Sequence, residues 1–280
     1  MGKQETKLTP EGFRGRPLQE LIDAAADLAR QGGAQLQQSA ELLRTAVEHP
    51  VEPYALGILR QQLWTVEQQL GLHRAYYSQA GQDRFAYERF FSDTASGTFV
   101  EIGAYDGVSG SNTCFFEKFL GWQGVLVEPV PRLAQACRQN RSATVIEAAV
   151  SSREGHADFL DVTGGFLQMG GLLEHYAEDM LTTVRQNVVH DEQTIRVPVM
   201  TLNQILAEND LKHVQFCSID TEGAEREVLS AVDFDRFRID VLAVENSGMK
   251  VGTGVCGLLE AAGYELAAVI GVDEIYRRLR

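Results

Sequence analysis

The stretch "GTFVEIGAYDGVSGSNT", residues 97–113, joins an apolar run to a small, polar and glycine-rich segment. The run holds one acidic residue, Glu101, and Gly103, Gly107 and Gly110 follow it closely. An apolar run that ends in glycines predicts a buried strand followed by tight backbone turns. Ligands of open α/β sheets bind at the carboxyl ends of such strands, so we expect a ligand site at this turn.

Outward from this stretch, strand patterns alternate with helix patterns from Gly71 to the end of the chain. Such alternation predicts parallel βαβ units, and we expect a Rossmann-like α/β fold with a doubly wound, mostly parallel sheet. The expected strands are 98–104, 124–129, 143–150, 214–220, 239–246, 264–270 and a short last strand at 274–279. The expected helices are 112–120, 130–140, 201–209, 223–232 and 254–262.

Two further apolar stretches, 156–162 and 194–202, predict extra strands on either side of a glycine-rich, polar insert at 163–193. This insert is longer than an ordinary connection between a helix and a strand, and long loops in compact domains often carry function. We therefore expect the insert to take part in substrate recognition.

The first 75 residues differ in pattern from the rest of the chain. Residues 1–16 are polar and contain glycine and proline, which predicts a flexible N-terminus. Over 17–75, apolar residues recur at spacings of three and four, which predicts a helical extension of three amphipathic helices. Their apolar stripes need a partner, so we expect a homo-oligomer interface or a lid over the domain at 76–280. Packing into a core of their own is the alternative.

Composition narrows the cellular setting. The 280 residues carry a net charge of −14, which argues against nucleic acid and anionic lipid as partners. No run of 18 apolar residues and no apolar leader occurs, so we expect no membrane span and a cytoplasmic location. The four cysteines are scattered without CxxC spacing, which favours reduced thiols over disulfides or a zinc site.

The turn after the first expected strand reads GAYDG and not the GxGxxG of a dinucleotide site. It suits a cofactor without phosphates, such as S-adenosylmethionine, whose ammonio-carboxylate end approaches the backbone at Gly103. Asp106 or Glu101 would then meet the amino group of the cofactor. Alternatively, the Glu101 carboxylate only satisfies nearby backbone N–H groups, because an acid in an apolar strand needs a partner.

The second expected strand ends in "VEP" at Glu128 and Pro129. Glu128 follows Gly103 at about the separation of the ribose-binding acid in dinucleotide sites, so we expect it to accept both ribose hydroxyls. Capping of the next helix is the alternative for this residue. The third expected strand ends near Ala149, where the adenine would lie.

Five ordered segments resemble the FkbM-type methyltransferases: "YSQAGQDRFAYERFF", "GTFVEIGAYDGVSGSNT", "GWQGVLVEPVP", "SIDTEGAEREVL" and "VLAVEN". The resemblance covers about Tyr76 to Tyr264. It implies a class I, S-adenosylmethionine-dependent fold with a seven-stranded sheet whose last strand is antiparallel. It also implies methyl transfer to a hydroxyl of a small molecule or glycan: a sugar, a lipopolysaccharide or glycolipid unit, or a polyketide- or peptide-derived natural product.

The resemblance further assigns individual residues. It implies that Glu101, Gly103 and Asp106 line the methionine end of the cofactor and that Glu128 holds the ribose. It also implies that Gln82 and Asp83 help to cover the cofactor. Asn112 and Thr113 match the family's pattern at the start of the following helix.

Acidic residues also end the fourth expected strand, at Asp220, Glu222 and Glu225. Methyl transfer is an in-line displacement that needs alignment and removal of a proton from the acceptor, and Asp220 or Glu222 could be that base. Glu225 is interpreted as a first-turn carboxylate that the helix dipole stabilises. His190, or His175, offers a second route to a base, although a loop histidine is more often only solvated.

The fifth expected strand ends at Glu245 and Asn246. Together with Asp220 these residues reproduce the layout in which some class I O-methyltransferases hold Mg²⁺, an ion that prefers oxygen ligands. Hydrogen bonding to the substrate is the alternative for the same groups.

Two other functions stay open from the sequence. An NAD(P)-dependent dehydrogenase could use a similar sheet, but the missing GxGxxG argues against it. A catalytically silent, cofactor-binding partner of a biosynthetic complex is the other, and the intact acids at the strand ends argue against that.

Overall fold

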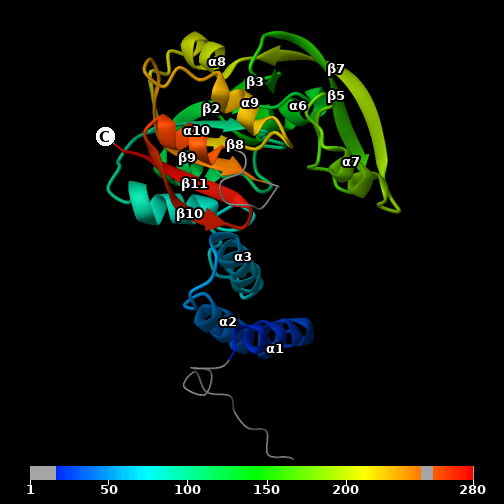
Figure 1. Ribbon diagram of the computed structural model, residues 1–280, viewed down its shortest axis with the longest axis vertical. Coiled ribbons are helices and arrows are strands. Elements are labelled where there is room, and N and C mark those ends of the chain that lie inside the picture. Colours follow the sequence, from blue (N-terminus) through cyan, green and yellow to red (C-terminus); the bar gives the residue numbers. More distant parts are fainter. Residues whose placement is uncertain (1–16, 247–254, 280) are drawn as a thin grey trace, which may run out of the picture.

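The computed structural model describes residues 17–246 and 255–279 (Figure 1). The flexible segment expected at 1–16 lies outside these residues. The helices are α1 (Leu18–Gln31), α2 (Gln35–Ala46), α3 (Pro53–Gln69), α4 (Gln82–Ala86), the π-turn η2 (Tyr87–Phe91), α5 (Cys114–Leu120), α6 (Pro131–Asn140), α7 (Glu178–Arg185), α8 (Leu202–Glu208), α9 (Glu225–Ser230) and α10 (Cys256–Ala261). The strands are β1 (Thr98–Ile102), β2 (Gln123–Val127), β3 (Thr144–Ile146), β4 (Ala149–Val150), β5 (Gly155–Gly164), β6 (Gly171–Leu172), β7 (Asp191–Met200), β8 (His213–Ile219), β9 (Arg238–Glu245), β10 (Tyr264–Ile270) and β11 (Asp273–Arg278).

Seven of these strands form the central sheet in the order β10-β11-β9-β8-β1-β2-β3. All neighbours pair in parallel except β11, which runs antiparallel to both β9 and β10. The doubly wound, mostly parallel sheet and its antiparallel last strand are therefore confirmed. Ile102 of β1 pairs with Val127 of β2 and with Ile219 of β8. The loops after these three strands consequently open at one edge of the sheet.

Strand β1 lies in the middle of the sheet because both of its faces are apolar. Val100 and Ile102 pack into one core, with α8, α9 and α10, whereas Phe99 packs into a second core with α4, α5 and η2 on the opposite face. This alternation is the period of two expected for a strand that is covered on both sides. The charged Glu101 is buried on the second face, so it requires hydrogen-bond partners there.

A second sheet, which the sequence did not predict, has the strand order β4-β7-β5-β6. The strands expected at 156–162 and 194–202 are confirmed as β5 and β7, which form a long hairpin. The single strand expected at 143–150 is wrong, because it divides into β3 of the central sheet and β4, which pairs with β7. The hairpin and α7 project beside the central sheet (Figure 1). Residues 163–193 form its distal half and fold back through β6 and α7.

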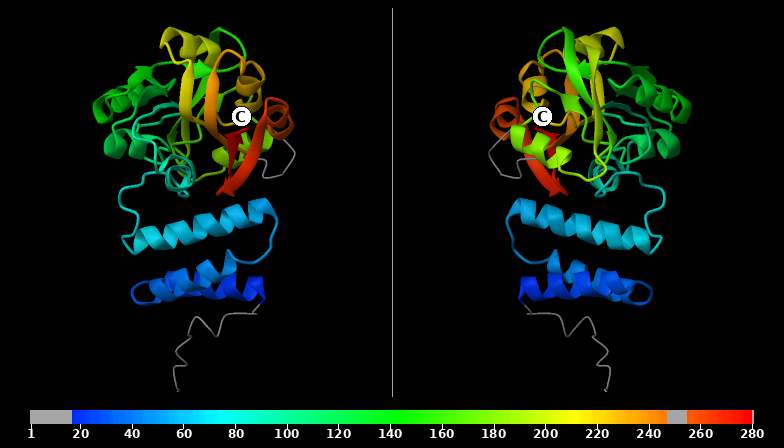
Figure 2. Two further views of the ribbon diagram at one scale, coloured as in Figure 1. Left: turned by 90° about the vertical axis from the view of Figure 1, so that its left-hand side faces the viewer. Right: turned by 90° about the vertical axis from the view of Figure 1, so that its right-hand side faces the viewer.

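Helices α1, α2 and α3 lie below the central sheet, with α3 nearest to it (Figure 2). Their apolar residues form a shared core that includes Leu21, Leu43 and Leu59. The apolar stripes are therefore buried within the extension, as the alternative interpretation expected, and a homo-oligomer stays a prediction. No helix within residues 17–246 and 255–279 combines the length and apolar character needed to cross a bilayer.

Helix α3 contacts the central sheet through backbone groups. It starts with Pro53, and the Glu52 side chain caps it by accepting hydrogen bonds from two backbone N–H groups. Gly57 lies so close to the turn between β10 and β11 that its carbonyl accepts a hydrogen bond from the N–H of Gly271 at 3.1 Å. Arg60 donates to the carbonyl of Val269 at 2.9 Å. The extension is thus fixed to the edge of the central sheet.

We expect Gly57→Ala to lower the melting temperature. Alanine is the better helix former by about 1 kcal/mol, but a Cβ at this position would lie 2.5 Å from the Gly271 carbonyl oxygen. The free energy lost by separating α3 from the sheet should exceed the free energy gained from the higher helix propensity of alanine. Gly257→Ala in α10 is the matched control, because nothing lies within 4 Å of its added Cβ. Equal melting shifts for the two variants in scanning calorimetry would contradict this contact.

Candidate active site

The turn after β1 brings two strand ends into contact. Gly103 has a φ of +81°, and a Cβ there would lie 2.0 Å from the carbonyl oxygen of Asp220 after β8. The Gly103 N–H donates to the Val127 carbonyl of β2 at 3.0 Å. Tyr105, two residues on, holds the left-handed conformation that non-glycine residues rarely adopt, with a φ of +52°. Only glycine fits position 103, so the sequence predicted this turn correctly.

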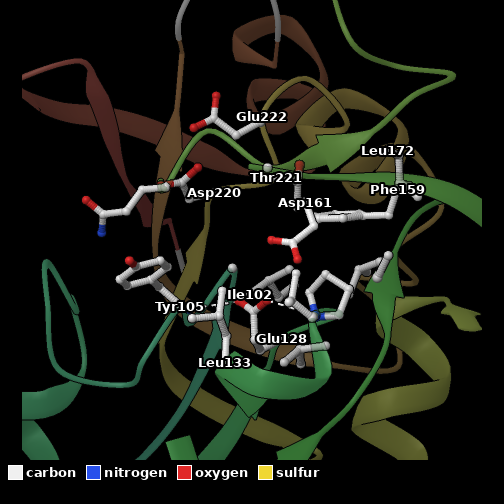
Figure 3. Close-up of a pocket in the computed structure, with 18 of the residues that line it drawn as sticks. Ile102, Tyr105, Glu128, Leu133, Phe159, Asp161, Leu172, Asp220, Thr221 and Glu222 are labelled. Carbon is white, nitrogen blue, oxygen red and sulfur yellow. Dashed lines mark hydrogen bonds between the residues drawn. The ribbon is translucent and has the colours of Figure 1, made fainter. Parts of the chain in front are cut away.

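Glu128 lies directly after β2 and faces this turn (Figure 3). One carboxylate oxygen accepts from the N–H of Tyr105 at 2.9 Å and the other from the N–H of Val130 at 3.0 Å. Burial nevertheless raises the pKa of Glu128 to about 7, because the charged form is poorly solvated. Each oxygen can accept a further hydrogen bond, so the geometry suits the predicted ribose contact.

Glu128 lines an inner cavity of about 690 Å³ between the two sheets. Its walls are largely apolar and include Val130, Leu133, Phe159 and Leu172. Pro129 and Ala149, both predicted to bind the cofactor, line it as well. The apolar walls and the carboxylate at one end give the inner cavity the chemistry of a slot for a nucleoside.

A narrow cavity of about 320 Å³ continues from the Gly103 turn past Asn112 and Ser218. The side-chain nitrogen of Asn112 donates to Ser218 at 2.9 Å, while its buried Oδ1 has no hydrogen-bond partner within the described residues. A buried acceptor without a partner is costly and suggests a ligand with a donor. Asn112 therefore fits the ammonium end of an amino acid moiety.

Glu101 also reaches the narrow cavity, but its carboxylate is held by the protein. It accepts from Ser111 Oγ at 2.8 Å, from the N–H of Asn112 at 2.8 Å and from Thr113 Oγ1 at 2.6 Å. The buried guanidinium of Arg141 lies 3.7 Å away. These contacts fix the loop before α5, and the contact of Glu101 with the amino group of the cofactor stays a prediction.

Other predicted cofactor residues lie around these cavities rather than in them. Both Asp106 oxygens accept from Val108 and Ser109 in a local turn, and the side chain lines none of the cavities described here. Asp83 is buried and accepts from Ser78 Oγ and three backbone N–H groups, so it shapes the preceding loop. Gln82 donates to Asp273 at 3.0 Å and lines the open cavity described below.

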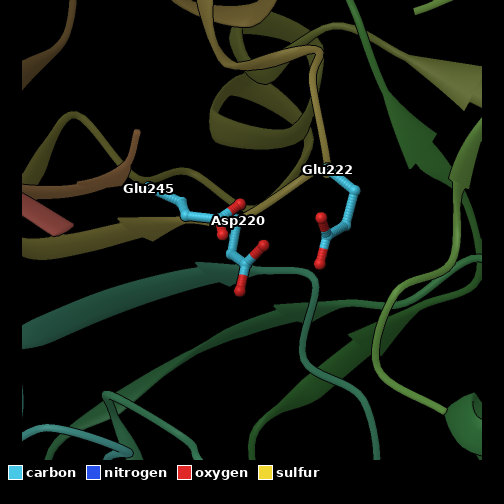
Figure 4. Close-up of side chains that lie close together, drawn as sticks. All are labelled: Asp220, Glu222 and Glu245. Atoms are coloured by element: carbon cyan, nitrogen blue, oxygen red, sulfur yellow. The ribbon is translucent and has the colours of Figure 1, made fainter. Parts of the chain in front are cut away.

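The carboxylates of Asp220, Glu222 and Glu245 converge at the ends of β8 and β9 (Figure 4). One oxygen from each lies within 4.8 Å of the others. Burial, together with repulsion from Asp273 and Glu225, raises the pKa of Asp220 to about 7. Burial, together with repulsion from Asp220 and Glu225, raises the pKa of Glu222 to about 9. Glu222 is 5% exposed, adopts a left-handed φ of +55°, and its Oε2 has no partner within the described residues. Strained backbone of this kind concentrates at functional sites.

Four predicted residues stand apart from this cluster. The Asn246 side chain turns to Tyr54 of α3 and to Glu274, to which it donates at 2.5 and 3.1 Å. His190 lies at the distal end of the hairpin, where its Nε2 contacts Glu192 at 2.7 Å. His190 and His175 line none of the three cavities, so the geometry gives neither a place as general base. Glu225 accepts from Thr221 and Gly223 at the start of α9, as interpreted.

An open cavity of about 1280 Å³ lies beyond the carboxylate cluster. Gln168 from the insert crosses its border, donates to the Ser109 carbonyl at 3.2 Å and accepts from Gln79 at 3.5 Å. Gln61 of α3 and Asp273 of β11 also line it. The sequence singles out none of these five residues, nor Asp161 in the inner cavity, because long-range packing brings them there and no local motif marks them.

These features define the class of protein. The seven-stranded order with one antiparallel strand, and an apolar cavity with a carboxylate beside a glycine turn without a pyrophosphate motif, are those of class I S-adenosylmethionine-dependent methyltransferases. The model of the methyltransferase FkbM domain matches residues 101–266. The chain belongs to the FkbM methyltransferase family, which confirms the resemblance and decides against the dehydrogenase.

Several solved structures are similar to this chain at low sequence identity. The FkbM methyltransferase of Methylobacillus flagellatus is 12% identical with a TM-score of 0.39; the match covers 92% of this chain and 59% of that one. The N-terminal domain of human METTL16 in complex with SAH is 11% identical with a TM-score of 0.37, over 98% and 96% of the two chains. The mitomycin 7-O-methyltransferase MmcR is 14% identical with a TM-score of 0.28, over 96% and 90%. The search of curated proteins gave no match.

Proposed function

We propose that the protein is an S-adenosylmethionine-dependent O-methyltransferase. Its acceptor would be a hydroxyl group of a sugar or glycolipid, or of a polyketide- or peptide-derived natural product. The observation that carries this proposal is the position of Asp220, which lines the inner, the narrow and the open cavity at once. Nucleoside, amino acid moiety and acceptor would therefore meet at one carboxylate.

The cofactor has a fitting set of groups in this chain. Glu128 would hold the ribose, the apolar walls of the inner cavity the adenine, and Asn112 with the Gly103 turn the methionine end. Bound there, S-adenosylmethionine supplies an electrophilic methyl group. Asp220, whose pKa lies near neutrality because of burial, would accept the proton of the acceptor hydroxyl in the open cavity. Glu222, with its higher pKa, would stay protonated and donate a hydrogen bond that orients the acceptor oxygen.

A divalent cation such as Mg²⁺ is the finer question within this proposal. Asp220, Glu222 and Glu245 offer three carboxylates at close range, and one oxygen each of Glu222 and Glu245 lacks a partner among the described residues. Hard oxygen donors of this kind suit Mg²⁺, which would lower the pKa of a bound hydroxyl. This ligand set contains Glu222 in place of the expected Asn246, whose amide is occupied by Tyr54 and Glu274.

The first test is calorimetric titration with S-adenosylhomocysteine and with NAD⁺, each with Mg²⁺ and with a chelator. We expect micromolar S-adenosylhomocysteine binding and no response to NAD⁺. If Mg²⁺ gives binding heat with the wild type and none with Glu222→Gln, the result would support the cation. If Mg²⁺ gives no heat with the wild type, the carboxylates act only as base and hydrogen-bond donor. Failure to bind S-adenosylhomocysteine would overturn the proposal. Binding without methyl transfer to any glycosyl or polyketide alcohol would favour the silent partner.

A further inference from the structure

One acidic residue in the inner cavity comes from the second sheet. Asp161 lies on β5, is 2% exposed, and lines the cavity with Phe159 and Leu172 (Figure 3). The intervening Leu160 and the next residue, Val162, pack into a separate apolar cluster on the other face of the strand. The alternation of β5 therefore directs Phe159 and Asp161 to the cavity.

Burying a carboxylate among apolar walls costs free energy unless hydrogen-bond partners, from the protein or from a ligand, replace the lost water. Asp161 accepts from Arg132 at 2.5 Å and from Gln193 at 2.9 Å, which fixes the side chain. An ion pair that only stabilised the hairpin would not need to line the cavity. Asp158, on the same strand, pairs with Arg196 at 3.0 Å and is 57% exposed. The difference between these two acids is their access to the inner cavity.

The central sheet leaves this side of the inner cavity without an acid. After β3 the lining residues are Ala148, Ala149 and Val150, and the neighbouring Glu147 pairs with Arg138 at the surface. An adenosine carries hydrogen-bond donors at its exocyclic amino group and at its ribose hydroxyls. Each oxygen of the Asp161 carboxylate has one contact from the protein and can accept another.

We propose that Asp161 accepts a hydrogen bond from the adenosine part of S-adenosylmethionine, from the exocyclic amino group or from a ribose hydroxyl. This inference rests on the proposed function. It gives the hairpin that carries the insert a role in cofactor binding, through Asp161 on β5 and through Gln193 on β7, which holds it. From its sequence, the insert at 163–193 is expected only to take part in substrate recognition.

The test is a binding cycle between variants and ligands, measured by calorimetry. The ligands are S-adenosylhomocysteine, S-inosylhomocysteine, which lacks the amino group, and the 2′-deoxy and 3′-deoxy forms of S-adenosylhomocysteine. We expect Asp161→Asn to weaken S-adenosylhomocysteine at least tenfold, and Asp158→Asn to change it less than twofold. One of the three analogues lacks the group that donates to Asp161. For that analogue, Asp161→Asn should lower the affinity less than threefold, and the missing group is thereby identified as the donor.

The outcomes separate this inference from the proposed function. If the wild type does not bind S-adenosylhomocysteine, the proposed function fails. If the wild type binds and Asp161→Asn binds equally well, or loses the same factor for all four ligands, the inference is overturned and Asp161 only positions the hairpin. A thermal melt checks that the variant is folded, and Asp161→Ser repeats the cycle if Asp161→Asn is not.

Discussion

Gly103→Ala should abolish cofactor binding and lower stability more than any other single methyl addition at this site. Its Cβ would lie 2.0 Å from the Asp220 carbonyl oxygen, which is backbone and cannot rotate away. The φ of +81° adds a conformational cost of about 1–2 kcal/mol for alanine. Relief requires β1 and β8 to separate where the cavities meet. We expect at least a hundredfold loss of S-adenosylhomocysteine affinity and a destabilisation of about 4 kcal/mol.

Gly121→Ala isolates the conformational cost from the clash. Gly121 ends α5 with a φ of +68°, but nothing lies within 4 Å of an added Cβ. It should lose only about 1 kcal/mol and bind S-adenosylhomocysteine as the wild type does. Chemical denaturation and calorimetry on the two variants give both quantities. If Gly103→Ala behaved like Gly121→Ala, the contact between the β1 turn and Asp220 would not exist in solution.

The strand ends could be predicted because their signals are local. Apolar runs, the glycine turn at Gly103 and the acids that follow β2, β8 and β9 are read within a few residues. Parallel strands place their carboxyl ends at one edge, so the meeting of Asp220, Glu222 and Glu245 follows once the sheet is expected. The FkbM resemblance added the seven strands of the sheet and its antiparallel last strand, and it agrees with the cofactor that the GAYDG turn favours.

The rest depends on contacts that no local pattern encodes. Arg141, which arrives from the end of α6, lies 3.7 Å from Glu101 and donates to Ser111 and Thr113, two of the residues that hold its carboxylate. His190 lies away from the carboxylates because the register pairs Gly164 with Asp191 near the end of the hairpin. In the sequence Asp161 is one residue of an expected strand, and only the second sheet turns it toward the inner cavity. Asn246 is diverted by Tyr54, a residue of the helical extension.

Glu128→Gln should weaken S-adenosylhomocysteine about a hundredfold at pH 8, because two ribose hydroxyls would lose a charged acceptor. The wild type should also bind more tightly as the pH rises from 6 to 8. With a Glu128 pKa of about 7, roughly one tenth of the carboxyl groups are ionised at pH 6, so the affinity should fall about tenfold there. Titrations across this range in both proteins measure the effect. If the affinity of Glu128→Gln still changes with pH, we assign that change to Asp220, whose pKa is also near 7.

The free energy of unfolding without ligand should change in the opposite direction. Burial raises the Glu128 pKa from an ordinary 4.5 to about 7, so the folded protein holds a proton that the unfolded chain has released. This contribution is fully present below pH 4.5 and is lost as the pH rises through 7. Asp161 raises this pKa and Arg132 lowers it, so burial remains the main cause of the shift. The wild type should therefore lose stability relative to Glu128→Gln between pH 5 and 8, over the same range in which its cofactor affinity grows. A pH-independent difference in melting temperature between the two proteins would show that Glu128 is ionised in the free enzyme throughout.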